Sequence, residues 1–498
     1  MIDHGIVDVA VIGGGINGAG IARDAAGRGL KVLLCEKADL AEGTSSRSGK
    51  LIHGGLRYLE YYEFRLVREA LIEREVLLAL APHIVRPMRF VLPHSPEQRP
   101  AWLIRLGLLL YDHLGGRKRL AGCRRIDMRN RPEGAPLKSD YRLAFEYSDC
   151  WVDDARLVVL NALDAARSGA VVLTRTAATA ARRVDGLWHV ELRDETGADH
   201  QVAARALVNA AGPWVEDVIA RVAGRNTSQR LRLVKGSHIV VPKFWRGPHA
   251  YLLQNDDRRV VFVNPYEGDL CLIGTTDIPY SGRPEDAAID DAEIEYLLAA
   301  VNRYAREPVA RSSILHAFSG VRPLFDDNAD NPSAVTRDYM LELDVEAGRA
   351  PLLSVFGGKI TTFRKLAEQA IERLAPFLPD VGRRWTGAVP LPGGDIADAD
   401  LAGFTVALSR RRAFLPPSLA QHYAGLYGTR ADELLGDAKA VADLGEHFGG
   451  LLYQREVQFL IDTEWARDAS DILERRTKHG LHLGADAKAR LEGFMAAA

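Results

Sequence analysis

The chain has 498 residues, of which 47% are hydrophobic and 26% charged, and its formal net charge is −2. A chain of this length holds two or three globular domains, and its composition excludes disordered and fibrous proteins. The near-zero charge favours no nucleic-acid partner, and four scattered cysteines without C-x-x-C spacing indicate reduced thiols in the cytoplasm.

The first apolar run begins almost at the N-terminus, without a charged and then apolar leader before it, so we do not expect secretion. No segment approaches the ~20 apolar residues that a membrane-spanning helix needs. No spacing of histidines, cysteines or acids suggests a metal site, so none is expected.

The N-terminal stretch has the pattern of a nucleotide-binding strand, turn and helix. Apolar residues over 7–12 predict a strand, Gly13, Gly15 and Gly18 follow in G-x-G-x-x-G spacing, and residues 16–29 predict a helix. Gly13 permits a tight turn, Gly15 lets the backbone approach a pyrophosphate, and Gly18 lets helix and strand pack closely. The stretch therefore predicts an anion site at a helix N-terminus.

A second apolar run over 32–34 ends on Glu36. A carboxylate at the end of this second strand accepts the ribose hydroxyls of a dinucleotide and repels a 2′-phosphate. Because strand, helix and acid agree, we predict a true dinucleotide site rather than a chance glycine turn.

The next segment, 43–55, is a polar loop bounded by glycines, and 56–81 has a helical pattern rich in Arg and Glu. The loop carries hydroxyls, Lys50 and His53, which suits a cofactor that extends further than NAD, as FAD does. A solvated turn is the alternative for this segment.

Residues 102–114 are apolar almost all round and are followed closely by basic residues, namely Arg117, Lys118, Arg119, Arg124, Arg125, Arg129 and Arg131. The run is too short to span a bilayer. It suits an interfacial segment in anionic headgroups, and a buried helix with a solvated basic neighbour is the alternative.

Further along, residues 149–165 predict a helix, 171–173 a strand, and 207–212 a buried strand that meets a glycine turn. Residues 231–345 are rich in alternating strands broken by Gly and Pro, so we interpret them mainly as an antiparallel substrate domain.

A second strand, glycine turn and helix follows, with a strand over 351–356, the pair Gly357 and Gly358, and an amphipathic helix over 361–374. Its helix N-terminus is a second positive dipole for the far end of a long cofactor. Residues 376–395 read as a linker, and the pattern is helical from 396 onward.

These features occur in segments that closely resemble the FAD-dependent, respiratory glycerol-3-phosphate dehydrogenases of bacteria. The segments, in chain order, are VIGGGINGAGIARDAAGRGL (11–30), KLIHGGLRYLE (50–60), EYSDCWVDDARL (146–157), LVNAAGPW (207–214), KGSHIVVP (235–242), IGTTD (273–277), SGVRPL (319–324), TRDY (336–339) and FGGKITTFRKLAE (356–368). The resemblance runs essentially end to end.

The resemblance implies an α/β plus α fold with a Rossmann-like FAD-binding domain of the amino-acid-oxidase type, an antiparallel β-rich substrate domain and a helical C-terminal domain. The expected boundaries are 1–80, 146–230 and 346–378 for the discontinuous FAD-binding domain, 81–145 and 231–345 for the substrate or cap domain, and 390–498 for the C-terminal domain.

The activity implied is the oxidation of sn-glycerol 3-phosphate to dihydroxyacetone phosphate, with hydride passing from C2 to FAD and the flavin reoxidised by ubiquinone or a related quinone. The expected setting is the cytoplasmic membrane surface, with peripheral attachment by the 102–131 region and a homodimer as the family's assembly.

By resemblance, Arg57, Arg337 and Lys359 are the expected phosphate ligands, and Tyr58 shapes their pocket. Arginine suits a phosphate because its planar fork binds two oxygens at once. Arg322 is expected to orient the C2 oxygen and stabilise the developing alkoxide.

His238 and His53 are both candidates for the proton acceptor, because imidazole titrates near neutral pH. A hydrogen-bonded structural histidine is the alternative for each of them.

The cofactor residues implied by the resemblance lie along FAD from the pyrophosphate to the ring. On the adenosine and diphosphate side they are Gly13, Gly14, Gly15, Ile16, Asn17 and Gly18 on the pyrophosphate, Glu36 on the adenosine ribose with Lys37 beside it, and Ala178 near the adenine. Along the diphosphate and ring they are Thr44, Ser45, Ser46, Lys50, Leu51, Ile52 and His53. The others are Gly212 and Trp214 at the turn after the strand over 207–212, and Gly357, Gly358, Lys359, Thr361 and Thr362 at the flavin end.

One position departs from the family, which commonly has serine where this chain has Gly49. Three other functions remain as alternatives: a glycerol-3-phosphate oxidase that uses oxygen, an amino-acid or sarcosine-type oxidase, and a membrane-associated FAD protein without turnover. The cationic cluster suits a dianion better than a zwitterion, which counts against the second.

Overall fold

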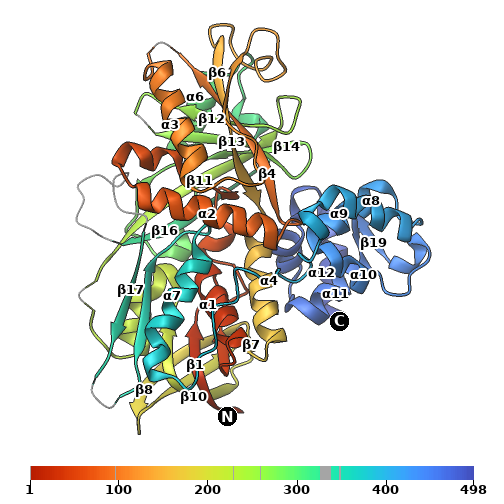
Figure 1. The fold of residues 1–498 in the computed structure, drawn as a ribbon. Coiled ribbons are helices and arrows are strands. Elements are labelled where there is room, and N and C mark those ends of the chain that lie inside the picture. The colour runs from red at the N-terminus through yellow and green to blue at the C-terminus, as the bar shows by residue number, and fades with distance from the viewer. Residues whose placement is uncertain are drawn as a thin grey trace.

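The computed structural model describes residues 2–95, 97–227, 229–257, 259–325, 338–346 and 349–497. Two large β-sheets lie one above the other in Figure 1, and the C-terminal region packs against their side. In the described part of the chain these sheets contain eight and ten strands.

The lower sheet is built around parallel strands. Its order is β17-β18-β10-β1-β2-β7, in which β1 pairs in parallel with β10 and β2, β10 with β18, and β2 with β7. Strands β17, β8 and β9 are antiparallel additions. The bounds are β1 Ile2–Ile12, β2 Val32–Cys35, β7 Val171–Leu173, β8 Thr176–Val184, β9 Leu187–Asp194, β10 Asp199–Asn209, β17 Tyr339–Asp344 and β18 Leu352–Gly357.

Three helices pack together against the parallel strands: α1 (Ile16–Gly27), α4 (Asp154–Arg167) and α7 (Phe363–Leu374). Their apolar sides form one buried cluster with strands β1, β2, β10 and β18. This is the layer arrangement that a parallel sheet requires, and it brings the N-termini of α1 and α7 to the same edge of the sheet.

The upper sheet is mainly antiparallel, in the order β15-β11-β14-β13-β12-β4-β6-β3, with β16 on β11 and β5 on β6. The bounds are β3 Leu51–Ile52, β4 Val85–His94, β5 Arg124–Asp127, β6 Leu143–Val152, β11 Leu231–Pro242, β12 Ala250–Gln254, β13 Val260–Tyr266, β14 Leu270–Gly274, β15 Ile278–Pro279 and β16 His316–Phe325. Helices α2 (Phe64–Leu80), α3 (Ala101–Leu114) and α6 (Asp291–Asn302) border this sheet (Figure 1).

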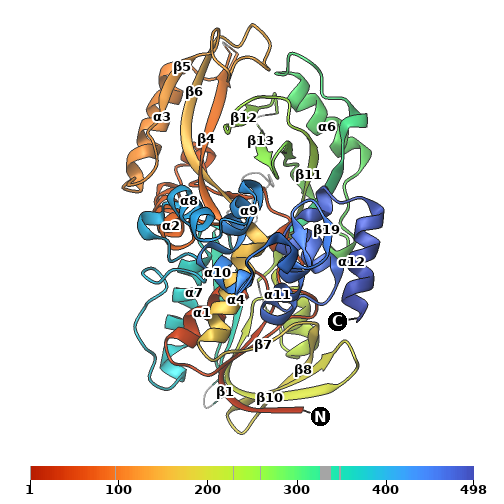
Figure 2. The same cartoon turned by 90° about the vertical axis from the view of Figure 1, so that its right-hand side faces the viewer.

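The C-terminal region is a helical layer across the junction of the two sheets, as Figure 2 shows. Its elements are α8 Leu401–Arg411, α9 Pro417–Tyr427, α10 Ala431–Leu435, the hairpin β19 (His447–Gly449) and β20 (Leu452–Tyr453), α11 Gln454–Glu464, the π-helix η11 Asp471–Arg476 and α12 Ala485–Ala497. It has its own buried core.

The predicted class, a Rossmann-like sheet with a β-rich domain and a helical C-terminal domain, is confirmed. The expected helix over 149–165 is wrong at its start, because β6 continues to Val152 and α4 begins at Asp154. Asp153 marks the change, since its side chain accepts a hydrogen bond from the Arg156 amide as a helix N-cap does.

Two other segments lie elsewhere than expected. Residues 339–344 form β17, which pairs with β18 in the lower sheet, although they fall in the range assigned to the substrate domain. The expected helix over 56–81 is divided into the 3-10 helix η2 (Leu56–Tyr61) and α2.

None of the helices in the described residues has the length and apolar character needed to cross a bilayer. Within the same residues, histidines, cysteines and acids form no cluster of three suited to a metal ion.

Candidate functional site

The glycine turn between β1 and α1 is shaped by close approaches that exclude a side chain. A Cβ on Gly13 would lie 2.5 Å from the Ala210 carbonyl oxygen, and one on Gly18 would lie 1.8 Å from the Gly13 oxygen. Gly13 also has a φ of 112°. The predicted reasons for these glycines, a tight turn and close helix packing, therefore hold in the structure.

The N-terminus of α1 is open to an anion. No acidic residue lies in its first turn, and a Cβ on Gly15 would meet only the Ser45 hydroxyl, at 3.2 Å. The Ile16 amide donates to the Ser45 Oγ at 3.0 Å. This backbone cradle fits a pyrophosphate, because a helix N-terminus offers unpaired N–H groups and a positive dipole.

Glu36 lies beneath the same turn. Its carboxylate accepts hydrogen bonds from the Gly14 amide at 2.6 Å and the Ala38 amide at 2.9 Å. Burial raises the pKa of Glu36 above its usual value, and these two amides oppose that rise. A carboxylate has about four acceptor positions, so two remain for a ribose.

The loop that follows is held by side chains from distant segments. Thr44 Oγ1 donates to the Val321 carbonyl at 2.6 Å. Lys50 is buried, and its ammonium contacts both oxygens of Asp154, at 2.7 and 2.8 Å, and the Ser46 carbonyl. The donors of the Lys50 ammonium are thus occupied within the protein, so Lys50 fixes the loop rather than facing an anion.

Strand β3 follows this loop and ends beside the start of α7. Leu51 and Ile52 pair with β6, and the next residue, His53, donates its amide to Thr361 Oγ1 at 3.3 Å. The His53 ring lies edge-on to Phe262, with 6.1 Å between centroids.

The two glycine turns meet through Asn17. Its Nδ2 donates to the Gly357 carbonyl at 3.2 Å, and a Cβ on Gly358 would lie 2.9 Å from the same nitrogen. Asn17 Oδ1 is buried and has no hydrogen-bond partner among the described residues. The structure therefore brings the two helix N-termini together, and it leaves a buried polar atom between them as a long cofactor site requires.

Thr361 and Thr362 are buried at the start of α7, where Thr362 is the N-cap residue. Lys359 extends from this turn, and its ammonium lies 4.0 Å above the Tyr58 ring. Arg57, one residue earlier than Tyr58, is half-buried and donates to the Tyr61 hydroxyl at 3.4 Å. The predicted substrate residues Lys359, Tyr58 and Arg57 are therefore neighbours, whereas Arg337 lies outside the described residues.

His238 is buried in β11. Its ring stacks on Phe318 at 5.0 Å, and Nδ1 has no partner among the described residues. Burial, followed by the charges of Arg322 and Lys50, lowers the pKa of His238 well below 6.5. The imidazole is therefore neutral at physiological pH and able to accept a proton.

Arg322 lies on β16, the strand that pairs with β11. It pairs with Asp277 and donates to Thr275 Oγ1 at 2.9 Å. A Cβ on Gly236 would lie 2.3 Å from its Nη2, so the glycine makes room for the guanidinium. Arg322 is partly exposed, whereas His238 is buried, and the charge of Arg322 is one cause of the lowered pKa of His238.

Gly49 lies beside His238. A Cβ there would meet only His238 Nε2, at 3.6 Å, and the Gly49 carbonyl accepts a hydrogen bond from Asn264 at 3.2 Å. Asn264 is buried, and its Oδ1 lacks a partner among the described residues. Sequence reasoning missed Asn264, although its polar side chain is an exception in the apolar strand β13.

The far end of the site contains Trp214. Its indole N–H donates to Glu285 at 3.0 Å, and the Lys37 ammonium lies 3.8 Å above its ring. Gly212 has a φ of 58°, and Ala178 packs against the buried cluster beneath the lower sheet. Glu285 was not predicted, because nothing in its local sequence indicates this contact.

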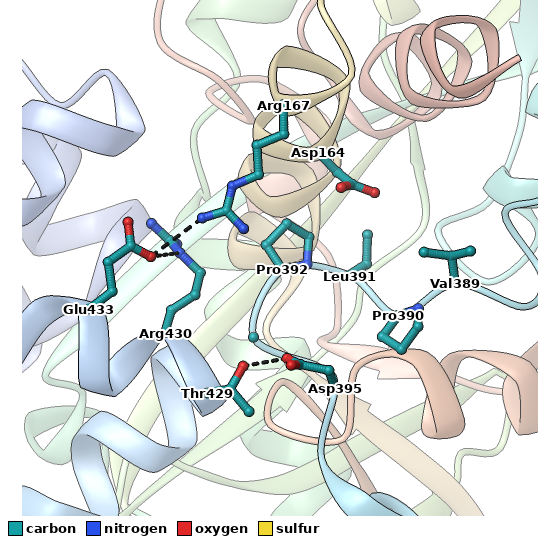
Figure 3. Close-up of a pocket in the computed structure, with 11 residues that line it drawn as sticks. Asp164, Arg167, Val389, Pro390, Leu391, Pro392, Asp395, Thr429, Arg430 and Glu433 are labelled. Carbon is teal, nitrogen blue, oxygen red and sulfur yellow. Dashed lines mark hydrogen bonds and ion pairs between the residues drawn. The ribbon is translucent and has the colours of Figure 1, made fainter. Parts of the chain in front are cut away.

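A cavity of about 420 Å³ lies elsewhere, between α4, the segment 389–395 and the start of α10 (Figure 3). Arg167 and Arg430 both reach Glu433 at its rim, and Thr429 bonds to Asp395. None of the predicted cofactor or substrate residues lines it.

Two protein-family models match most of the chain. Residues 8–364 match the family described as FAD dependent oxidoreductase, and residues 385–497 match the C-terminal domain of alpha-glycerophosphate oxidase.

Two similar relatives cover almost the whole chain. The D-erythritol 1-phosphate dehydrogenase of Brucella abortus is 63% identical over 96% of this chain and 95% of its own. The glycerol-3-phosphate dehydrogenase of Pseudomonas aeruginosa is 56% identical over 98% of this chain and 95% of its own.

Among solved structures, the glycerol-3-phosphate dehydrogenase from Bacillus halodurans complexed with FAD is similar, with a TM-score of 0.77. It is 26% identical, and the match covers 99% of this chain and 94% of that one.

Proposed function

The chain belongs to the family of FAD-dependent oxidoreductases, and from this premise we propose that it oxidises a short phosphorylated polyol. FAD is its cofactor, and the cradle at α1, Glu36 and the joined glycine turns fit that molecule. When bound, FAD accepts the hydride from the carbinol carbon, so the protein must hold the substrate and take the hydroxyl proton.

The phosphate is assigned to the cations around Tyr58. The observation that carries the proposal is the position of Lys359 over this ring, next to Arg57, in the turn that leads to α7. Charge-assisted hydrogen bonds contribute about 1.5–3 kcal/mol each, so a few cations suffice for a millimolar or tighter complex. Arg337 is proposed as a further ligand from the sequence alone.

His238 is proposed as the proton acceptor and Arg322 as the residue that stabilises the developing alkoxide. The neutral, buried imidazole is in the form that accepts a proton, whereas a guanidinium is always charged and serves as a donor. His53 remains the second candidate for the base.

The substrate is proposed to be sn-glycerol 3-phosphate or D-erythritol 1-phosphate. The first follows from the motifs of the chain and from relatives such as the Pseudomonas enzyme. The second is favoured by the higher identity to the Brucella enzyme and by the empty space that Gly49 leaves beside His238.

An anaerobic titration of the holoenzyme tests this proposal. Each polyol phosphate is added separately while the flavin absorbance is followed, and a soluble quinone is added afterwards. Bleaching by one or both substrates and recovery with quinone are expected. A flavin that stays oxidised at millimolar concentrations of both would refute the proposal.

The electron acceptor is proposed to be a membrane quinone. An oxygen-using enzyme is the second candidate, because the C-terminal domain matches that of alpha-glycerophosphate oxidase. Peroxide production in aerated buffer without quinone, at a rate close to that with quinone, would favour the oxidase.

Helix α3 is proposed to attach the protein to the membrane. Trp102 and Leu106 are 67% and 55% exposed, and Leu103, Leu109 and Leu110 are exposed beside them. Arg105 and Lys118 are exposed nearby and suit anionic headgroups. Figure 2 shows α3 on the outer side of the upper sheet.

Vesicle binding tests this attachment. Leu106→Glu is expected to reduce cosedimentation with anionic vesicles by tenfold or more, because it places a charge in the apolar face, while turnover with a soluble quinone is kept. Val406→Glu is the matched control, since Val406 is 51% exposed on α8. Equal binding by both variants and the unaltered protein would exclude α3 as the contact.

A further inference from the structure

The C-terminal region reaches the cofactor loop through buried ion pairs. Asp39 lies after β2, three residues beyond Glu36, and its side chain is fully buried. It accepts from Arg475 Nε at 2.6 Å and from Arg476 Nη2 at 2.8 Å. Both arginines belong to η11, which ends more than 430 residues later in the chain.

The other end of the loop is held from the same segment. The Lys478 ammonium contacts Asp153 at 2.5 Å, and the neighbouring Asp154 accepts from Lys50 and from the Ser48 hydroxyl at 2.6 Å. The Val152 amide also donates to the Lys50 carbonyl at 2.9 Å. Residues 475–478 thus contact the start of the 39–50 loop directly, and they contact its end through the adjoining residues Asp153 and Asp154.

Both partners of each of these ion pairs are buried charged side chains. The side chains of Arg475, Arg476 and Lys478 are at most 7% exposed, as are those of Asp39 and Asp153. Removing one member of such a pair leaves an uncompensated charge away from water, so each arrangement holds only while both partners are in place. The loop conformation is therefore coupled to the position of the C-terminal segment.

We propose that residues 475–478 are positioning residues that hold the 39–50 loop in its FAD-binding conformation, so that the C-terminal domain controls how tightly FAD is retained. The loop carries Ser45, which contacts the α1 N-terminus, and Thr44, which contacts β16. Loss of the Asp39 contacts frees the start of the loop and thereby displaces the Ser45 hydroxyl from the pyrophosphate cradle.

A second buried ion pair between α4 and the C-terminal region supplies a matched control variant. Arg156 on α4 pairs with Glu464 on α11, with 3.0 Å between Nη2 and Oε1, and both side chains are fully buried. This pair crosses the same junction, yet the guanidinium contacts no residue of the 39–50 loop. Glu464 also accepts a hydrogen bond from Arg476 through its backbone carbonyl, so Arg156→Gln removes the Arg156–Glu464 side-chain pair and leaves the contacts of Arg475 and Arg476 with Asp39 in place.

The experiment compares Arg476→Gln and Asp39→Asn with Arg156→Gln. Apoprotein is prepared from each variant, and the Kd for FAD is measured by quenching of flavin fluorescence, together with the unfolding temperature and the visible circular dichroism of the bound flavin. All three variants are expected to unfold at lower temperature. Only the first two are expected to raise the Kd at least tenfold and to alter the flavin dichroism, with Arg476→Lys restoring part of the affinity.

Equal Kd values for the loop variants and Arg156→Gln, at equal loss of unfolding temperature, would overturn the proposal. If Arg476→Gln does not fold, Lys478→Gln provides the milder test at the other end of the loop. An unchanged Kd in Lys478→Gln and Asp39→Asn would likewise refute it. The readout is FAD binding, so the outcome does not depend on which polyol phosphate is oxidised.

Discussion

At the scale of single residues, His238 is the side chain whose surroundings bear most directly on chemistry. Burial and the charges of Arg322 and Lys50 keep the pKa of His238 well below 6.5. Its imidazole therefore stays neutral at pH values at which an ordinary histidine is already protonated. For the unaltered enzyme, kcat/KM is therefore expected to stay level down to pH 6.5 and to fall only below it, in a pH-rate profile.

Substitution of the same residue gives a second readout. His238→Asn is expected to lower kcat by roughly 10²–10⁴-fold, the range typical of a lost general base, while FAD stays bound. His53→Asn is the matched comparison, because His53 lies at the same site on Phe262. A larger loss for His53→Asn would transfer the role of base to that residue.

Gly49 gives a prediction about substrate choice. Its φ is not in the left-handed region, and an added Cβ would meet only His238 Nε2 at an ordinary 3.6 Å, so Gly49→Ala is expected to fold with an unchanged unfolding temperature. A substrate that bonds to this nitrogen shares the space that the methyl fills. We expect kcat/KM for D-erythritol 1-phosphate to fall several-fold more than for sn-glycerol 3-phosphate; an equal fall would show that this space does not select the substrate.

The sequence could predict residues whose position follows from local spacing. The positions of Gly13, Glu36 and the second glycine pair belong to this class, because each lies at or directly after the end of a strand, whereas their roles toward FAD stay predictions. Lys50 was placed along the cofactor, but its ammonium pairs with Asp154, a contact across 104 residues that no local pattern encodes.

At the scale of elements, the unit β1-α1 depends on one close approach. Gly18→Ala would place a Cβ 1.8 Å from the Gly13 oxygen, so α1 must move away from the turn. We expect a loss of about 1–3 kcal/mol in the free energy of unfolding, the usual cost of overpacking, and a marked loss of bound FAD. Denaturant unfolding and flavin absorbance measure both.

Gly107 provides the control for this substitution. It lies inside α3, and an added Cβ would have nothing within 4 Å. Gly107→Ala is expected to stabilise the protein by about 0.5–1 kcal/mol through helix propensity, without change in FAD content. Similar effects of the two substitutions would contradict the steric explanation.

Element prediction succeeded where apolar periodicity is strong and failed where a strand and a helix adjoin. Residues 146–152 pair with β4 across the upper sheet, and only this long-range pairing distinguishes them from the start of α4. The hairpin at 447–453 was hidden in a helical region for the same reason, since its two short strands stabilise one another only through their mutual pairing.

At the scale of the whole molecule, the junction with the C-terminal region contains a buried neutral histidine. Burial first, and then the charges of Arg156, Arg86 and Arg430, lower the pKa of His83 well below 6.5, while Glu464 opposes them. Neither ring nitrogen has a partner among the described residues. His83 must therefore gain a proton when the protein unfolds below pH 6.5.

This sets the sign of one pH effect on stability. Below pH 6.5 the unfolded chain binds a proton at His83 that the folded protein does not, so acid lowers the free energy of unfolding, by at most about 1.4 kcal/mol per pH unit from this group. Above pH 6.5 its contribution is complete. The unfolding temperature of His83→Leu is expected to fall less than that of the unaltered protein between pH 7 and 5.

Exposed His113 supplies the comparison, since it lies at the end of α3 in solvent. His113→Leu is expected to keep the pH dependence of the unaltered protein. If His83→Leu and His113→Leu behave alike, the acid sensitivity arises elsewhere in the molecule.

The plan of the whole molecule was accessible from the long motifs, but the contacts between its parts were not. Asp39 and Arg476 are 437 positions apart, and each has a local sequence that would equally suit a solvated surface. Burial alone makes their pairing necessary, and burial is decided by how the completed domains meet.

The contact between Asn17 and Gly357 has a consequence for biosynthesis. The two halves of the nucleotide site leave the ribosome 340 positions apart, and Asp39 is synthesised 437 positions before its partner Arg476. A nascent chain therefore carries an unfinished site until residue 476 has been synthesised. A chain that ends before residue 475 lacks the two arginines that hold Asp39, although both of its glycine turns are complete.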